Sequence, residues 1–382
     1  MKINRKRLIT DLSRLVQIPS WQECDTIARH AVAALRDAGA RNVHIDKAGN
    51  VIGTLGRGGK GLLLNAHLDT VPPGDYEGDP FSGKVSAGKL IGRGSSDDKA
   101  GVAAILEIVR YLAGRQLNQQ ITFALTVWEE STGPGENGAY QAARDCDAAR
   151  CIVLENSMAA TGKSMGVNIG CRGTMGLYVT VHGKACHAAD PARGVNAVYR
   201  AARVIQALEK TFDPATMPRK TYKVWNSQVE LGTLATVTEV EARQGINVIP
   251  AQCEIALNCR LLPDGDGSEI KRRMKRLATE LPKGWISWST KREIVGHLCE
   301  DHEFIAVCRE AICESGMRTK CEIMGGRTDT TIFQHTGGIQ SVIMGPGTLG
   351  AAHTKNEYMD IELLVKGTGA VLRTIEKMAV DG

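Results

Sequence analysis

Histidine and carboxylate side chains follow an apolar stretch early in this chain. Residues 62–70 read Leu-Leu-Leu-Asn-Ala-His-Leu-Asp-Thr, so a strand that begins with three leucines continues to His67 and Asp69. The two-residue period of a β-strand places these two side chains on the same face. This arrangement suits a metal ligand with a partner behind it, because a ligating imidazole usually donates its second N–H to an acceptor. Taken alone, the pair fits a buried structural histidine better.

Later apolar strands lead to acidic residues in the same way. Strands predicted over 121–127 and 151–154 are followed by three glutamates, Glu129, Glu130 and Glu155. An α/β sheet gathers its site at the carboxyl ends of its strands, so these side chains are expected to meet His67. The repeated pattern therefore favours a metal site over a buried structural histidine.

A glycine-rich loop over 88–99 contains Asp97 and Asp98 and precedes a helix predicted over 100–112. A phosphate-binding loop is the alternative interpretation. However, the loop contains neither G-x-x-x-x-G-K-[ST] nor G-x-G-x-x-G, and paired aspartates repel a phosphate. The acidic pair therefore predicts a cation site.

The order of elements predicts an α/β fold with an inserted module. From about residue 177 the pattern is β-α-β-β-α-β, which is typical of a ferredoxin-like module. Its predicted elements are strands at 177–181, 228–234 and 253–261 and helices at 195–208 and 268–277. The larger domain resumes near Glu293 and closes with a helix over 362–377. We therefore expect a catalytic domain of residues 1–174 and 293–382, interrupted by an inserted domain of residues 175–292.

Composition narrows the class of protein. A hydrophobic share of 43% and a charged share of 23% in 382 residues are typical of a soluble globular enzyme. The net charge is only +5 and aromatic residues are few, so nucleic-acid binding is unsupported. The first helix is amphipathic and no apolar run is long enough to cross a bilayer. The eleven cysteines are odd in number and contain no C-x-x-C pair, which predicts reduced thiols in a cytoplasmic protein.

The combined motifs resemble the M20 family of metallopeptidases and amidohydrolases, which includes acetylornithine deacetylase, succinyl-diaminopimelate desuccinylase and glutamate carboxypeptidase. The resemblance extends over nearly the whole chain. It rests on His67-x-Asp69, Gly-Arg-Gly-Ser-Ser-Asp97-Asp98-Lys99, Glu129-Glu130, Glu155, Gly183-Lys-Ala-Cys-His187, Asn247-Val-Ile-Pro250, Gly345-Pro-Gly and His353.

The resemblance implies a catalytic domain built as an αβα sandwich that binds two zinc ions, with Co²⁺ or Mn²⁺ able to substitute. The inserted ferredoxin-like domain would serve as a lid and as the dimerisation surface of a homodimer. Asp97 would bridge the two metals, and a cis peptide bond would follow it. The remaining ligands would be His67, Glu130, Glu155 and His353.

The resemblance also implies roles around the metals. Glu129 would act as general base on the attacking water, and Asp69 would orient His67. His187 would hydrogen-bond the tetrahedral oxyanion, in several relatives from the partner subunit, although an exposed loop histidine is the alternative. Asn247 and Arg260 match positions that hold a substrate carboxylate, whereas an arginine paired with a structural acid is the alternative for Arg260.

The implied activity is hydrolysis of an amide bond in a small carboxylate-bearing substrate, such as deacylation of an N-acyl amino acid. A dipeptidase or carboxypeptidase with the same metal site is a second interpretation, and a non-catalytic binding homologue is a remote third. The sequence departs from many relatives at Trp128, Asn258 and Arg327, and residues 131–137 resemble an inserted loop beside Glu129. These departures surround the site without removing a ligand, so they bear on which substrate is accepted.

Overall fold

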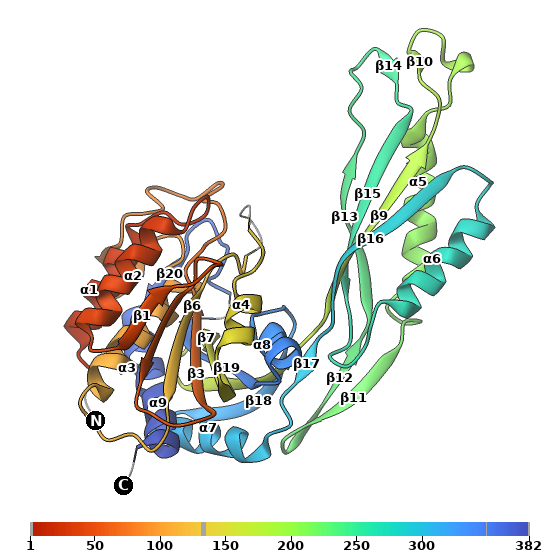
Figure 1. Ribbon diagram of the computed structural model, residues 1–382. Coiled ribbons are helices and arrows are strands. Elements are labelled where there is room, and N and C mark those ends of the chain that lie inside the picture. Colours follow the sequence, from red (N-terminus) through yellow and green to blue (C-terminus); the bar gives the residue numbers. More distant parts are fainter. Residues whose placement is uncertain (1–2, 131–134, 349, 381–382) are drawn as a thin grey trace. The chain divides into compact units, whose positions relative to one another are not determined.

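The computed structural model describes residues 3–130, 135–348 and 350–380. The chain divides into two compact units (Figure 1). The first contains the chain up to Gly170, Leu298–Ile323 and the segment from Thr328 onward, and the second contains Cys171–His297 and Met324–Arg327. The predicted insertion, 175–292, falls inside the second unit. Part of the predicted inserted loop, at 131–134, lies outside the described residues.

A mixed nine-stranded sheet forms the centre of the first unit. Its strand order is β1 (Arg41–Ile45), β2 (Val51–Leu55), β6 (Ile121–Thr126), β3 (Gly61–His67), β7 (Ala148–Met158), β19 (Gln340–Thr348), β8 (Ser164–Cys171) and β17 (His297–Leu298), with β18 (Arg318–Met324) beside β8. Strands β6, β3, β7 and β19 run parallel. Every residue of β3 and β6 is buried, as expected for parallel strands covered on both faces.

Helices pack on both faces of this sheet, which confirms the predicted αβα sandwich (Figure 1). Helices α3 (Lys99–Leu112) and α9 (Ile361–Ala379) pack against the sheet, with α1 (Arg5–Val16), α2 (Asp25–Asp37) and α7 (His302–Glu314) around them. Helices α4 (Ala139–Asp145) and α8 (Thr330–Gly337) cover the other side. A separate small sheet joins β4 (Lys84–Ser86), β5 (Lys89–Ile91) and β20 (Tyr358–Asp360).

The second unit has the predicted ferredoxin-like core. Its antiparallel sheet has the order β13 (Leu234–Glu241), β15 (Gln252–Arg260), β9 (Thr174–His182) and β16 (Ile286–Ile294). Helices α5 (Ala197–Thr211) and α6 (Ser268–Glu280) contribute to one apolar core with the sheet. Burial alternates along β9 and β15, because only one face of this sheet meets the helices. Additional elements are β10 (Cys186–His187) with β14 (Val248–Ile249), the short helix η1 (Pro191–Arg193), and β11 (Arg219–Val224) with β12 (Ser227–Gly232).

One predicted strand of this module is wrong. The sequence predicts a core strand over 228–234, but β12 pairs only with β11 in a separate hairpin, and β13 supplies the core strand. The physical reason is that β13 lies at the edge of the sheet and is mostly exposed or half-buried. Its weak apolar alternation therefore does not identify it, whereas β12 alternates polar and apolar residues as convincingly as a core strand.

Candidate metal centre

Three neighbouring parallel strands bring the predicted ligands of the first unit to one sheet edge. His67 is the last residue of β3, and Glu129 and Glu130 follow the end of β6. The sequence predicts that Glu155 follows the end of its strand. In the structure Glu155 lies inside β7 instead. Strand β7 continues to Met158 because β19 pairs with it as far as Thr348.

Asp97 contacts both predicted histidine ligands through different oxygen atoms. Its Oδ1 lies 3.1 Å from His67 Nε2, and its Oδ2 lies 3.5 Å from His353 Nε2. His353 Nε2 also lies 2.7 Å from Glu130 Oε1. Ligand atoms of His67, Asp97 and Glu130 all fall within 4.8 Å of one another, so they could hold one cation together. One carboxylate between two imidazoles is the arrangement that a bridging ligand requires.

The backbone around these residues adopts unusual conformations. The peptide bond between Asp97 and Asp98 is cis, as the family resemblance implies. Trp128 and His353 have positive φ angles of 64° and 60°, which residues other than glycine rarely adopt. Positive φ angles in such residues concentrate at functional sites, where the surrounding contacts hold them.

Asp69 connects His67 to the glutamate pair. His67 Nδ1 lies 3.0 Å from the Asp69 carbonyl oxygen and 3.5 Å from its carboxylate Oδ1. The same carboxylate accepts hydrogen bonds from the backbone N–H groups of Glu129 at 3.1 Å and Glu130 at 3.0 Å. Asp69 thus contacts the imidazole, and its carboxylate also holds the backbone of the turn that carries both glutamates.

Negative charge is in excess at the carboxyl ends of these strands, as expected for a site that binds divalent cations. Burial raises the pKa of Glu155 well above its ordinary value, and the negative charges of Glu129 and Asp97 raise it further. Within the described chain, Glu155 Oε1 is buried and accepts no hydrogen bond. Burial opposes protonation of His67, but hydrogen bonds to Asp69 and Asp97 outweigh it and raise the pKa of this imidazole. The hydrogen bond to Glu130 raises the pKa of His353 to about 9. A buried carboxylate is stable in its charged form only when a positive charge lies close to it. Carboxylates and imidazoles gathered in this way are a donor set that suits Zn²⁺ and related ions.

Asn50 supports the glutamate turn and is not found by sequence reasoning. Its fully buried side chain accepts a hydrogen bond from Val127 N at 3.2 Å and donates to the Gly138 carbonyl at 2.8 Å and to Asp46 Oδ2 at 2.7 Å. These bonds hold the end of β6 beside the start of α4. The only local signal is the Gly49-Asn50 turn, which does not point to a site nearly eighty residues away in sequence.

Glu357 is a second residue that sequence reasoning misses. It is fully buried, and its carboxylate accepts hydrogen bonds from the loop that carries Asp97. Burial raises the pKa of Glu357 and the charge of Asp97 raises it further, while the hydrogen bond from Arg93 acts in the opposite direction. Glu357 follows no apolar strand, so the pattern that identifies the other acids does not single it out.

With this geometry in view, comparison with known proteins identifies the family. The model of peptidase family M20/M25/M40 matches residues 63–377. The chain belongs to this family. It is accordingly a metal-dependent hydrolase of amide or peptide bonds.

Relatives of this M20 member include deacylases and peptidases. The chain is 25% identical over 353 residues to a succinyl-diaminopimelate desuccinylase of Marinobacter nauticus, with 89% of each protein covered. It is 30% identical over 304 residues to the desuccinylase of Methylorubrum extorquens, with 75% of each covered. A tripeptidase from Staphylococcus aureus is structurally similar, with a TM-score of 0.75, 25% identity, and coverage of 98% of this chain and 99% of that one. No helix in the described part of the chain is long and apolar enough to cross a membrane.

The other three predicted site residues of this M20 member belong to the second unit. His187 is exposed on β10, where its Nδ1 accepts a hydrogen bond from Ala189 N at 3.1 Å. Asn247 lies beside it, since its carbonyl accepts from Ala188 N at 2.9 Å. Arg260 is half-buried at the end of β15. The unit therefore brings His187 and Asn247 together and places Arg260 elsewhere.

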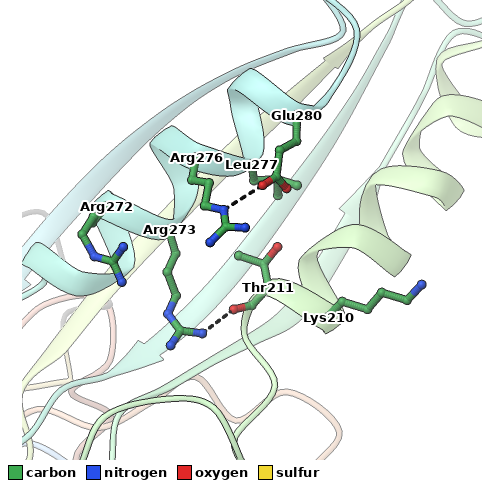
Figure 2. Close-up of a pocket in the computed structure, with 7 residues that line it drawn as sticks. All are labelled: Lys210, Thr211, Arg272, Arg273, Arg276, Leu277 and Glu280. Atoms are coloured by element: carbon green, nitrogen blue, oxygen red, sulfur yellow. Dashed lines mark hydrogen bonds and ion pairs between the residues drawn. The ribbon is translucent and has the colours of Figure 1, made fainter.

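A pocket of about 350 Å³ in the second unit contains none of the predicted site residues (Figure 2). It lies between α5 and α6 and is lined by Lys210, Thr211, Arg272, Arg273, Arg276, Leu277 and Glu280. Its arginines already have partners: Arg272 and Arg273 pair with Glu269, and Arg276 pairs with Glu280. Arg273 also donates to the Thr211 carbonyl at 2.8 Å. The bond from Arg273 to Thr211 joins α6 to the end of α5, and the ion pairs within α6 account for the three arginines.

Proposed function

We propose that this M20 member hydrolyses the amide bond of an N-acyl amino acid or a similarly small substrate that carries a carboxylate. The observation that carries the proposal is the contact of Asp97 with both His67 and His353 beside Glu130. The desuccinylase relatives, which by name remove an acyl group from an amino acid, support the choice of substrate class.

Two divalent cations per chain would be held by the carboxylates and imidazoles at the sheet edge, with Zn²⁺ the proposed ion and Co²⁺ or Mn²⁺ as substitutes. When bound, such ions lower the pKa of a shared water towards neutrality and polarise the substrate carbonyl. The ligands would be His67, Asp97, Glu130, Glu155 and His353.

Glu129 is the proposed general base and, later, general acid. The Asp69 carboxylate accepts hydrogen bonds from the backbone N–H groups of both Glu129 and Glu130, so it fixes the backbone of the proposed base beside the proposed ligand. Glu129 is itself buried, and its negative charge is one cause of the raised pKa of Glu155. A carboxylate in this position can take a proton from the attacking water and return it to the leaving amine.

Arg260 is the proposed partner of the substrate carboxylate, and Asn247, which lies beside His187, is a further proposed polar contact that would reach the substrate together with His187. Within the described residues, no carboxylate pairs with the Arg260 guanidinium, which disfavours the alternative of a structural ion pair. Arg172 is buried nearby and donates to the Arg260 carbonyl at 3.2 Å. Burial lowers the pKa of Arg172, and the charge of Arg260 lowers it further. Two neighbouring guanidinium groups produce a positive region that suits an anionic group.

We further propose that the enzyme works as a homodimer in which His187 acts on the partner's site. Arg260 pairs with Thr174 at one end of β9, while His187 follows the other end, beyond His182. A nine-residue strand spans about 26 Å, too far for both side chains of one chain to hold one small substrate. His187 and Arg260 could meet the same substrate only if they come from different chains.

Mixing two inactive variants tests this arrangement. His187→Ala and Glu129→Ala each disable a different part of the site. If His187 acts in the partner's site, a mixed dimer contains one complete site, and equal mixing after dissociation and reassociation should restore about a quarter of the unaltered activity. The two variants assayed separately are the controls. No recovery in verified mixed dimers would contradict action across the interface.

A cytoplasmic location is part of the proposal. All eleven cysteines are free thiols and most are buried. Free thiols persist in a reducing compartment, whereas oxidising compartments favour disulfides.

The substrate class is tested by a panel of small amides. We expect zinc-loaded protein to hydrolyse acetyl or succinyl amino acids with a higher kcat/KM than dipeptides or tripeptides of the same amino acids. A matched amide without the carboxylate should be a poor substrate, because Arg260 then loses its partner. The panel includes peptides because the chain is also similar to a tripeptidase. Turnover of peptides but not of acylated amino acids would contradict deacylation and indicate a peptidase.

A further inference from the structure

The buried carboxylate of Glu357 binds the loop that ends in Asp97. Its Oε1 accepts hydrogen bonds from the backbone N–H groups of Ser96 at 3.0 Å and Asp97 at 3.1 Å. Its Oε2 accepts from Gly94 N at 3.1 Å and from Arg93 Nη1 at 2.8 Å. Four donors therefore occupy both oxygen atoms. Because these lone pairs are used, Glu357 is unsuited to ligate a metal or take a proton, and its role must be exerted through the groups that it holds.

The same residue connects this loop to the segment that carries His353. Arg93 Nη1 also donates to the carbonyl of Thr354 at 3.1 Å, directly after His353. The Glu357 carbonyl accepts from Gly92 N at 3.2 Å. The ion pair of Arg93 and Glu357 is almost completely buried, so solvent screens it little. The segments before Asp97 and after His353 thus share one buried anchor.

Strand pairing places this anchor where it is needed. Strand β20 begins immediately after Glu357 and pairs antiparallel with β5, with Tyr358 opposite Ile91. This register carries Glu357 alongside Gly92 and Arg93. The carboxylate then fills a cradle of backbone N–H groups that a shorter or neutral side chain could not satisfy in the same way.

We propose that Glu357 is a positioning residue for the metal centre, which holds the backbone of Asp97 in a fixed relation to His353. This inference rests on the proposed metal-dependent function. The geometry of the proposed metal ligands thus depends on the Glu357 carboxylate, which itself binds no metal. Supporting groups of this kind typically change metal affinity by about 10- to 100-fold when they are altered.

Glu357→Gln tests the proposal with a side chain of nearly the same size. In either orientation, the amide directs its NH₂ group at two existing donors: at Ser96 N and Asp97 N, or at Gly94 N and Arg93 Nη1. The loop must then move. We expect the affinity for Co²⁺, titrated into apo protein and followed by visible absorption, to fall by about 10- to 100-fold. The rise in melting temperature on adding Co²⁺ should shrink accordingly.

Three comparisons make the outcome decisive. Glu362→Gln alters an exposed glutamate at the start of α9 that pairs with Arg5, and should leave Co²⁺ binding unchanged. Glu357→Asp keeps the charge with a shorter reach, so its Co²⁺ affinity should fall less than that of Glu357→Gln but remain measurably below that of the unaltered protein. A merely structural role would lower the melting temperatures of the apo and Co²⁺-loaded forms equally, with affinity and spectrum unchanged. That result overturns the proposal.

Two further outcomes are also informative. If Glu357→Gln yields no folded protein, the Co²⁺ affinity of Glu357→Asp tests the proposal instead. Unaltered Co²⁺ affinity in that variant overturns the proposal. If the unaltered protein itself binds no Co²⁺, Zn²⁺ or Mn²⁺, the proposed metal-dependent function fails, and that failure is distinguishable from failure of the role assigned to Glu357.

Discussion

Replacing Glu129 with alanine is expected to abolish hydrolysis while leaving the metal content unchanged. The substitution removes the proposed base but none of the proposed ligands, and general acid–base catalysis typically contributes about 10²- to 10⁴-fold. The backbone N–H that Asp69 holds remains in place, so the turn should keep its shape. The measurements are kcat on the best substrate of the panel and metal content by elemental analysis after dialysis.

Glu300→Ala is the matched control for this variant. Glu300 is an exposed glutamate that belongs to none of the segments of the proposed site, so its loss removes an equal charge without altering that site. It should retain full activity. If Glu129→Ala also retains full activity, the assignment of the base is wrong; if it loses metal, Glu129 acts as a ligand instead.

Replacing Asp97 with asparagine is expected to remove both metal and activity. Asp97 offers one oxygen to His67 and the other towards His353, and an amide retains only one oxygen and adds a donor. A neutral side chain cannot bridge two cations as a carboxylate can. We expect metal affinity to fall by more than about 100-fold, since altering residues behind the ligands already costs up to that much.

The comparison between the two variants separates binding from catalysis. Asp97→Asn should give substoichiometric metal by elemental analysis, together with a smaller thermal shift on adding Zn²⁺. Asp37→Asn, at the exposed end of α2, controls for the charge change and should behave like the unaltered protein. Retention of the full metal content by Asp97→Asn would rule out its role as the bridging ligand.

Local sequence patterns predict much of the sheet edge. A run such as Leu62 to Leu64 is apolar because both faces of a parallel strand are covered, and the polar residue that closes this strand, His67, lies at its carboxyl end, where α/β sheets form their sites. The same argument applies to Glu129 after β6. It is less accurate for Glu155, because β7 continues beyond the apolar run where β19 extends the pairing.

The inserted module shows where such patterns fail. The alternation in β9 and β15 reports a single core-facing side and is readable from sequence. Strand β13 is stabilised by pairing with β15 at the edge of the sheet. Its membership depends on backbone hydrogen bonds to a neighbour, which leave little trace in its own residues.

The sequence by itself determined which residues could bind metal, because strand periodicity and residue chemistry are local properties. Only the tertiary structure decided what holds those residues in place. Gly94 and Glu357 are separated by 263 residues and meet through the pairing of β5 with β20, and Asn50 reaches Val127 across 77 residues. A buried hydrogen bond between distant segments depends on how the whole chain packs, so no spacing in the sequence announces it.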